Sequence, residues 1–328
     1  MNALVIGATG IIGNHVVRAL LAKGIVVSAL SRGKTPSRNL DDLDVKRITG
    51  DINDVETLHK AFKGHDWIFQ AAAYYPQNTF QWKHHIAESG KGVQNVIQAA
   101  LKAGVSRLIY TSSLTTIGMV KKGQLADESI GYNLVGRDPH PYFLVKYLAE
   151  ANLKEAHAKL GLPVVIVNPT GCFGPYELKP SSLCLVPQLM NRQIPAYLSH
   201  AGNVVDVADV GRGHVLAAKK GRLGERYILG GHNIDFAEVA KDICRVGGVK
   251  APRFRAPVAL ALALGTADEA FSYLCKKSPH FPVLGVRFVE FGQYFSIEKA
   301  QRELGYKAGP MEPCYERAIA WYKKIGYC

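Results

Sequence analysis

The chain has 328 residues, of which 48% are hydrophobic and 20% are charged, a composition typical of a soluble globular protein with a sizeable core. No stretch reaches the roughly 18 consecutive apolar residues of a membrane span, and glycines interrupt the apolar N-terminus. We therefore expect no signal peptide and a cytoplasmic location. The net charge of +13 admits nucleic acid or an anionic membrane surface as partners, but Lys and Arg are dispersed, so we expect no nucleic acid. The cysteines form no C-x-x-C pair, which indicates free thiols and no metal site.

Strand-length apolar runs alternate with helical patterns through the first half of the chain. Because these runs are apolar throughout, we expect strands buried on both faces of a parallel sheet that helices cover on both sides. The fold class is therefore α/β, a Rossmann-type doubly wound parallel sheet. The predicted strands are residues 3–7, 25–30, 45–51, 66–73, 106–113 and 162–171, and the predicted helices are 11–24, 53–62, 80–103 and 140–161.

A smaller, less regular lobe is predicted late in the chain. From about residue 170 the pattern loosens into short elements punctuated by Pro and Gly. We assign residues 1–168 to the Rossmann domain, with a return segment near 203–230. Residues 169–202 and 231–328 form the predicted substrate-binding lobe.

The stretch GATGIIG follows the first predicted strand and opens the first predicted helix. Gly7 permits a tight exit from the strand, Gly10 lets backbone approach a pyrophosphate, and Gly13 lets helix and sheet pack closely. The helix N-terminus offers unpaired N–H groups to the anion. The stretch therefore predicts a dinucleotide-binding turn. Its other expected cofactor contacts are Thr9, Ile11 and Ile12.

The end of the second predicted strand indicates which dinucleotide binds. It reads ALSRGK, with Ser31 where an acidic residue would bind the ribose 2′-hydroxyl of NAD, and Arg32 beside it. A carboxylate would repel a 2′-phosphate, whereas a guanidinium binds one through two charge-assisted hydrogen bonds. We therefore predict NADP(H); the alternative is that Arg32 is only a solvated loop residue. Asp51 and Ile52, after the third strand, are placed to meet the adenine.

Tyr142 and Lys146 lie four residues apart on one face of a predicted helix. An ammonium near a phenol favours the phenolate, so we expect Lys146 to lower the Tyr142 pKa from about 10 and to make the phenol a usable proton donor or acceptor. Earlier, YTSS brings hydroxyls to the carboxyl end of a central strand, where doubly wound sheets bind ligands. Ser113 would donate to the substrate oxygen, whereas Ser112 is also open to interpretation as an ordinary turn residue.

These motifs occur in the order and at the spacing of a known family. GATGIIG, GDIND, QAAA, YTSS and YFLVK resemble the extended short-chain dehydrogenase/reductases over nearly the whole chain. LPVVIVNP, RLGERYILGG and WYKKIGY are similar to the dihydroflavonol-4-reductase-like and hopanoid-associated sugar epimerase branch. The resemblance implies a catalytic set of Ser113, Tyr142 and Lys146, with Lys146 also on the nicotinamide ribose. It further implies cofactor contacts from Ala71, Ala72, Ala73, Ser112, Pro169 and Thr170.

The substrate lobe decides between ketone reduction and sugar epimerisation, because the same three residues serve both reactions. Family members that act on nucleotide-sugars carry arginine and asparagine where this chain has Asn168 and Gly171. They carry another arginine where it has Gly202 and Asn203. A diphosphate without its guanidinium loses a strong contact, so we predict NADP(H)-dependent reduction of a ketone, or oxidation of the alcohol. The alternatives are a nucleotide-sugar epimerase or dehydratase, and a non-catalytic NADP-binding sensor.

Two segments are candidates for contact with a small-molecule substrate. AAAYYPQ should overhang the nicotinamide, with Tyr74 and Tyr75 as contacts; Leu114 and Gly171 complete the predicted set. Residues 257–274 are apolar and rich in Ala and Leu. They fit either a buried packing helix, or a pocket wall or membrane contact that admits a lipid-like ketone.

Two further features come from the resemblance. Ser89 and Gln70 stand where the family often has asparagine and histidine, which would alter proton relay or cofactor geometry. The long helices at 80–103 and 140–160 form a dimer contact in many relatives, so we expect a homodimer.

Overall fold

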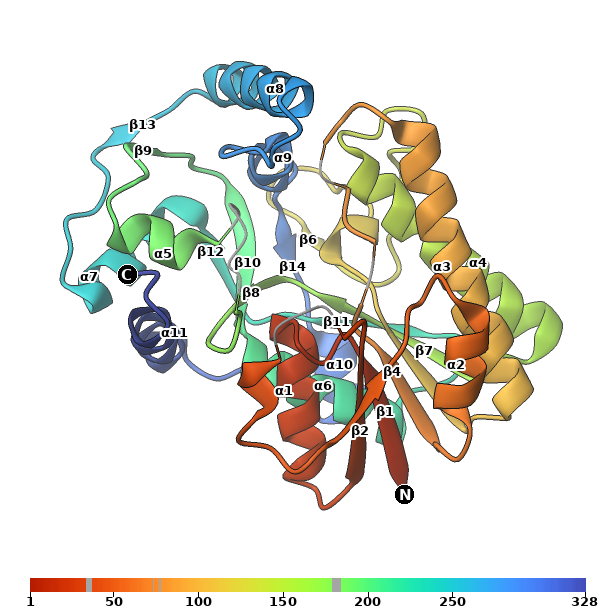
Figure 1. The fold of residues 1–328 in the computed structure, drawn as a ribbon. Helices are drawn as coiled ribbons and strands as arrows, with labels where there is room; N and C mark the ends of the chain where they lie inside the picture. Colours follow the sequence, from red (N-terminus) through yellow and green to blue (C-terminus); the bar gives the residue numbers. More distant parts are fainter. Residues whose placement is uncertain (34–36, 73, 77, 179–183) are drawn as a thin grey trace.

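Seven parallel strands form the central sheet of the molecule, in the order β11-β7-β5-β4-β1-β2-β3. The computed structural model describes residues 1–33, 37–72, 74–76, 78–178 and 184–328 (Figure 1). The chain reverses its winding direction between β1 and β4, the switch point at which such sheets bind ligands. The predicted α/β class with a doubly wound sheet is confirmed. The strands are β1 (Asn2–Ile6), β2 (Val26–Ser31), β3 (Lys46–Thr49), β4 (Trp67–Gln70), β5 (Arg107–Thr111), β7 (Val164–Pro169) and β11 (Arg226–Leu229).

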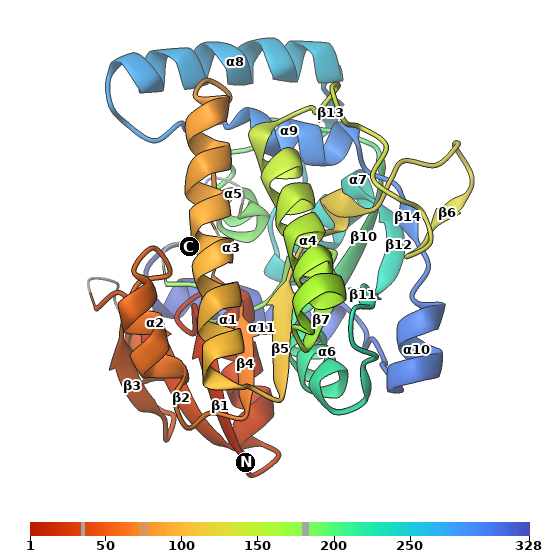
Figure 2. The ribbon, with the colours of Figure 1, turned by 90° about the vertical axis from the view of Figure 1, so that its right-hand side faces the viewer.

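Helices cover both faces of this sheet (Figures 1 and 2). Side chains alternate along each strand, so Ala3 and Val5 of β1 enter one core while Leu4 and Ile6 enter the other. The first core contains α1 and α6, and the second contains α2, α3 and α4. Apolar side chains on both faces explain why the strands lack polar alternation. The helices are α1 (Ile11–Leu21), α2 (Val55–Phe62), α3 (Trp82–Ala103), α4 (Pro141–Leu160) and α6 (Val207–Lys220).

Helix α4 has well-defined ends. His140 precedes it and accepts a hydrogen bond from the Tyr142 N–H at 3.1 Å, while Pro141 occupies the first turn. Gly161 ends the helix in the left-handed conformation, with φ of 69°. These ends fix the register that places Tyr142 and Lys146 over the carboxyl edge of the sheet.

The later part of the chain builds a third core around a small sheet of β8 (Gly171–Phe173), β10 (Ala201–Asp206) and β12 (His232–Asp235). Of the predicted return segment near 203–230, α6 and β11 join the Rossmann core, while β10 belongs to the small sheet. The remaining elements are the strands β6 (Leu125–Ala126), β9 (Ala196–Tyr197), β13 (Phe254–Arg255) and β14 (Tyr294–Phe295), the 3-10 turns η1 (Arg38–Leu40) and η2 (Leu114–Thr116), and the helices α5 (Leu185–Met190), α7 (Phe236–Gly247), α8 (Val258–Leu274), α9 (Val283–Glu290), α10 (Glu298–Leu304) and α11 (Glu312–Lys324).

Candidate active site

The glycine turn after β1 is shaped so that side chains cannot occupy it. Gly7 has φ of +83°, and a Cβ there would lie 2.6 Å from the Ala72 backbone nitrogen. A Cβ on Gly13 would lie 2.1 Å from the Gly7 carbonyl oxygen. Both residues must therefore be glycine for β1, α1 and the strand exit at Ala72 to meet so closely.

The N-terminus of α1 suits an anionic group. Gly10 is the N-cap residue and, among the described residues, no side chain caps the helix or places an acid in its first turn. The N–H groups that begin α1, with Thr9 before them and Ile11 and Ile12 within them, thus remain oriented for a phosphate.

Unpartnered buried polar atoms lie in or next to two of the predicted cofactor segments. The Ser112 hydroxyl and the Asn53 side-chain oxygen are buried without a hydrogen-bond partner in the described part of the chain. Such atoms are rare in native interiors and call for a ligand or water. Together with the glycine turn they make the site fit a dinucleotide, which would supply hydride chemistry when bound.

The remaining predicted cofactor residues line the same edge of the sheet. The N–H groups of Ala71 and Ala72 both donate to the Ile6 carbonyl at 2.9 Å, which sets the exit of β4 against the glycine turn. Pro169 ends β7, and the buried Thr170 hydroxyl donates to Asn203 at 2.8 Å. Ala73 lies outside the described residues.

The predicted adenosine side is more open. Ser31 ends β2, and Arg32 follows it with an exposed side chain that makes no hydrogen bond or ion pair among the described residues. Asp51 accepts a hydrogen bond from the Asn53 N–H at 3.0 Å. Ile52 is fixed by its carbonyl, which accepts from Asn95 at 2.8 Å.

Ser113, Tyr142 and Lys146 converge at the carboxyl end of β5. All three side chains are buried, and the Ser113 side chain forms a hydrogen bond with Tyr142. The Lys146 ammonium donates to the Thr111 carbonyl at 3.0 Å, and its nitrogen lies 5.9 Å from the centroid of the Tyr142 ring. The chain therefore assembles a serine, a phenol and an amine in one buried place from two separate segments.

The electrostatics of this group differ from the sequence-based expectation. Burial raises the pKa of Tyr142 to about 12, and the hydrogen bond from Ser113 only partly offsets this rise. Burial also lowers the pKa of Lys146 to about 8, against the attraction of Glu150. The prediction that Lys146 lowers the Tyr142 pKa is wrong, because desolvation of the buried phenol dominates and raises that pKa.

Aromatic rings cover the reactive phenol. The Tyr75 ring lies 5.1 Å and the Phe288 ring of α9 lies 5.6 Å from the Tyr142 ring, centroid to centroid. The Tyr74 hydroxyl instead shares a hydrogen bond of 2.7 Å with His85. Of the two predicted tyrosine contacts, Tyr75 is thus the one that touches Tyr142, and an apolar wall faces the reaction centre.

The other two predicted substrate residues lie at the edges of the site. Leu114 opens η2 and packs against the cluster around Ile117 and Phe295. Gly171 begins β8, where a Cβ would lie 3.0 Å from the Asn203 carbonyl oxygen. Close strand packing accounts for this glycine.

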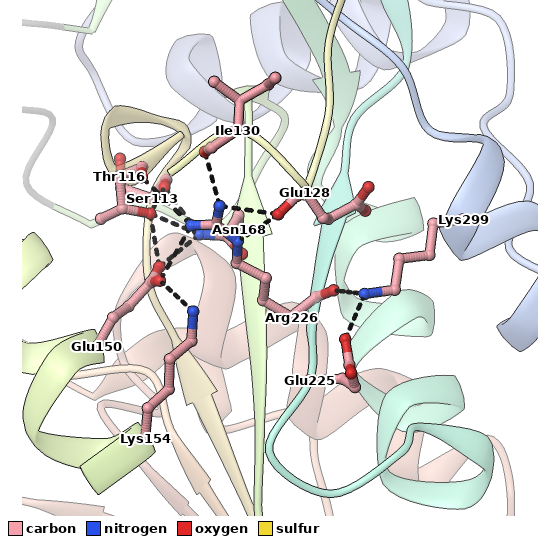
Figure 3. A network of polar contacts seen from close by, with 10 residues as sticks. All are labelled: Ser113, Thr116, Glu128, Ile130, Glu150, Lys154, Asn168, Glu225, Arg226 and Lys299. Carbon is pink, nitrogen blue, oxygen red and sulfur yellow. Dashed lines mark hydrogen bonds and ion pairs between the residues drawn. The ribbon is translucent and has the colours of Figure 1, made fainter. Parts of the chain in front are cut away.

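A buried polar network supports the site from behind (Figure 3). The Asn168 amide nitrogen donates to the Ser113 carbonyl at 3.0 Å and to Glu150 at 2.6 Å. Glu150 also accepts from the Thr116 hydroxyl at 2.5 Å and pairs with Arg226 at 3.4 Å. Arg226 in turn donates to backbone carbonyls of the 128–130 loop. This network ties the backbone of Ser113 to α4 and β11.

Family members that act on nucleotide-sugars bind them through arginine and asparagine side chains at certain positions. In this chain those positions lie within the polar network and the neighbouring lobe. Asn168 is fully buried and engaged with Ser113 and Glu150. A Cβ on Gly202 would lie 2.6 Å from the Phe236 ring, and Asn203 bonds Thr170 inside the lobe. These positions are interior, so a long cationic side chain does not fit at Gly202.

A small cavity lies behind Lys146. Its volume is about 10 Å³, at the lower limit for holding one water molecule, and its lining includes Gln70, Ser89, Tyr110 and Lys146. Both residues that depart from the family pattern, Gln70 and Ser89, therefore border the amine side of the site.

Sequence reasoning missed several residues of the site. Phe288 comes from a helix 146 positions after Tyr142, and no local pattern links them. Glu150 and Arg226 were likewise missed, since a buried ion pair is visible only after the strands are assembled. The capping role of His140 was missed because histidine is not among the usual capping residues, although Pro141 marked the start of the helix.

Comparisons with known proteins agree with this geometry. A family model described as the NAD dependent epimerase/dehydratase family matches residues 3–230. The chain is 34% identical to the putative dihydroflavonol 4-reductase of Synechocystis sp., over 98% of this chain and 95% of that protein. It is 27% identical to sterol demethylase protein B of Methylococcus capsulatus, over 99% of both. The crystal structure of PA4631, a nucleoside-diphosphate-sugar epimerase from Pseudomonas aeruginosa, matches with a TM-score of 0.83 and 26% identity, over 100% of this chain and 99% of that one.

Proposed function

Because the chain belongs to the NAD dependent epimerase/dehydratase family of extended short-chain dehydrogenase/reductases, we propose that it is an NADP(H)-dependent reductase of an apolar ketone. The observation that carries the proposal is the buried Ser113–Tyr142 hydrogen bond beside the Lys146 ammonium, under a wall of aromatic rings. Reduction needs a proton donor next to the carbonyl oxygen, and the Tyr142 phenol is such a donor in a buried site.

Each of the three residues has a distinct part in the proposed reaction. Ser113 donates a hydrogen bond to the substrate oxygen and holds it against Tyr142. Tyr142, whose pKa of about 12 keeps the phenol protonated at neutral pH, gives its proton to that oxygen as hydride arrives at the carbon. Lys146 stabilises the phenolate left behind and is positioned by the Thr111 carbonyl.

The preference for NADP(H) rests on Arg32. Its guanidinium is exposed beside the end of β2 and forms no ion pair with the described residues, so it is available to a 2′-phosphate. The neighbouring Ser31 presents no carboxylate that would repel that phosphate.

The choice of reduction over nucleotide-sugar epimerisation rests on the substrate lobe. The aromatic wall of Tyr75 and Phe288 suits an apolar molecule, and the Gly202 position has no room for a guanidinium. Two of the relatives point the same way by name, one as a reductase and one as a sterol-processing protein.

Epimerisation or dehydration of a nucleotide-sugar is the second candidate. It is favoured by the family model's description and by the name of the Pseudomonas structure. An epimerase takes its hydride back, so it consumes no cofactor overall, whereas a reductase consumes one NADPH for each alcohol formed.

The test is cofactor consumption by the wild-type protein. We expect NADPH to be oxidised in step with alcohol formation from apolar ketones, and NADH to be oxidised more slowly at equal concentration. Conversion of a nucleotide-sugar without net consumption would establish the epimerase instead. Binding of NADPH without turnover of any ketone or sugar would establish a cofactor-binding sensor.

A further inference from the structure

Helix α8 carries a continuous apolar stripe on its exposed face. Leu260, Leu264, Phe271 and Leu274 are 53%, 58%, 65% and 80% exposed, and Ala267 lies between them. Their spacing of i, i+4, i+7, i+11 and i+14 places them on one side of the helix. Large apolar side chains are usually exposed singly, and a contiguous row of them marks a surface that another apolar phase covers.

Glu269 of α8 points inward, and Asp268 is engaged with the loop before α9, so neither carboxylate is part of the stripe. Glu269 is 1% exposed and accepts hydrogen bonds from Thr79 and from the Val283 N–H at 2.9 Å. Asp268 accepts from the Phe281 N–H at 2.7 Å. These bonds fix the rotation of α8 about its axis, so the exposure of the stripe is a property of the fold.

Cations flank the stripe at both ends. Arg253 and Arg255 precede α8, Lys276 and Lys277 follow it, and all four are exposed. An apolar helix face bounded by basic residues is the pattern of a helix that lies in the interface of an anionic membrane. A second copy of the chain is a poorer partner, since either orientation of two such helices brings cations against cations.

The helix also lies next to the approach to the reaction centre. Figures 1 and 2 show α8 at the outer edge of the molecule, beyond α9 and close to the start of α3. Tyr273 contacts Phe80 with ring centroids 5.2 Å apart and accepts a hydrogen bond from Gln81 at 3.0 Å. The adjoining helix α9 supplies Phe288, whose ring covers Tyr142.

We propose that α8 and its flanking cations dock on an anionic membrane surface, and that the substrate is an apolar carbonyl compound dissolved in that membrane. The contact is interfacial: within the described residues, no helix has the length and apolarity needed to cross a bilayer. The docking stands on α8 alone, whereas the substrate class rests on the proposed reductase function. The exposure of these side chains argues against one sequence interpretation of 257–274, the buried packing helix.

The experiment is co-sedimentation of the full chain with vesicles, without cofactor or substrate. We expect binding to vesicles of equal phosphatidylglycerol and phosphatidylcholine, and much weaker binding to phosphatidylcholine alone. The double variant Leu264→Glu with Phe271→Glu should lower the partition coefficient at least about 100-fold, because two buried apolar side chains are lost. The pair Lys276→Glu with Lys277→Glu should lower it at least about tenfold.

The matched control is Leu160→Glu. Leu160 ends α4 with 61% exposure, comparable to Phe271, but lies in no apolar stripe, so its substitution should leave partitioning unchanged. Absence of binding to anionic vesicles, or equal binding by the Leu264→Glu, Phe271→Glu protein, overturns the proposal. So does sedimentation showing a dimer that those substitutions dissociate.

The same variants separate this proposal from the reductase function. With a water-soluble ketone, the Leu264→Glu, Phe271→Glu protein should consume NADPH at the wild-type rate, because neither residue lies in the reaction centre. Ketone reduction without vesicle binding refutes the docking alone. Vesicle binding without any ketone reduction refutes the reductase function and leaves the docking in place.

Discussion

Helix α4 carries two groups of buried polar side chains that differ in how far their bonding capacity is used. Among the described residues, the side chains of Tyr142 and Lys146, in its first two turns, make one hydrogen bond each, and their pKa values are strongly shifted. One turn later, Glu150 receives hydrogen bonds from Thr116 and Asn168 and pairs with an arginine. The residues follow at i, i+4 and i+8, so one helix face passes from a reactive group to a structural one.

The difference separates buried polar side chains that hold the fold together from those that are free to react. A fully engaged buried carboxylate holds elements together, because removing any partner leaves a charge unpaired. A phenol and an amine kept short of partners can still take up a substrate and a cofactor, and their altered pKa values are typical of reactive sites. Changes in the first group should therefore affect turnover, and changes in the second should affect stability.

The largest effect is expected from Tyr142→Phe. Loss of the proton donor should lower kcat/KM for ketone reduction by about 10³- to 10⁴-fold, roughly 4–5.5 kcal/mol. The free energy of unfolding should hardly change, since the ring and its contacts with Tyr75 and Phe288 remain. Steady-state NADPH oxidation and urea unfolding measure the two quantities. Tyr147→Phe, on the same helix, is the control and should behave as wild type.

The opposite pattern is expected from Glu150→Ala. Arg226 and Asn168 would lose their buried partner, and the free energy of unfolding should fall by about 3–5 kcal/mol. Urea unfolding measures it. Glu155→Ala, which removes an exposed ion pair with Lys159 on the same helix, should leave stability unchanged. If the free energy of unfolding fell equally in Glu150→Ala and Glu155→Ala, Glu150 would have no special structural role, and the distinction between the reactive and the structural side chains of α4 would fail.

A smaller effect is expected at the adenosine end. Arg32→Ala should raise the KM for NADPH about 10- to 100-fold, because a charge-assisted pair with the 2′-phosphate is lost. The KM for NADH serves as the internal control and should stay within about twofold. If the KM rose equally for NADPH and NADH, Arg32 would not bind the 2′-phosphate.

The smallest effect is expected from pH. Burial lowers the Lys146 pKa to about 8, so the ammonium is present below that pH and is lost above it. Tyr142, at about 12, stays protonated throughout this range. The kcat/KM for reduction should therefore be level from pH 6 to pH 7 and fall about tenfold per pH unit well above 8. Lys146→Arg keeps its charge and should show a flat profile, and a wild-type profile that is flat to pH 10 contradicts the assignment.

Much of the sheet domain was predictable because its signals are local. The doubly buried strands are uninterrupted apolar runs, and the predicted boundaries lie within a few residues of those observed for β1, β2 and β5. Gly7 and Gly13 were predictable because a close approach of backbone admits no other residue. Pro141 and Gly161 likewise fixed the two ends of α4.

What the sequence could not supply depends on distant neighbours. The Tyr142 pKa is governed by desolvation, which requires knowing that residues from α9 cover the ring. The exposed face of α8 depends on Glu269 turning inward to bind Thr79, some 190 positions away. The homodimer through α3 and α4 stays a prediction.

Transfer of deuterium tests the central claim most directly. NADPH carrying deuterium on the transferred position of the nicotinamide C4 would be incubated with an apolar ketone, wild-type protein or the Tyr142→Phe variant, and the alcohol analysed by mass spectrometry. The account predicts one deuterium on the carbinol carbon with the wild type and at least about 10³-fold slower labelling with the variant. Unlabelled alcohol, or labelling at the same rate by both proteins, would contradict it.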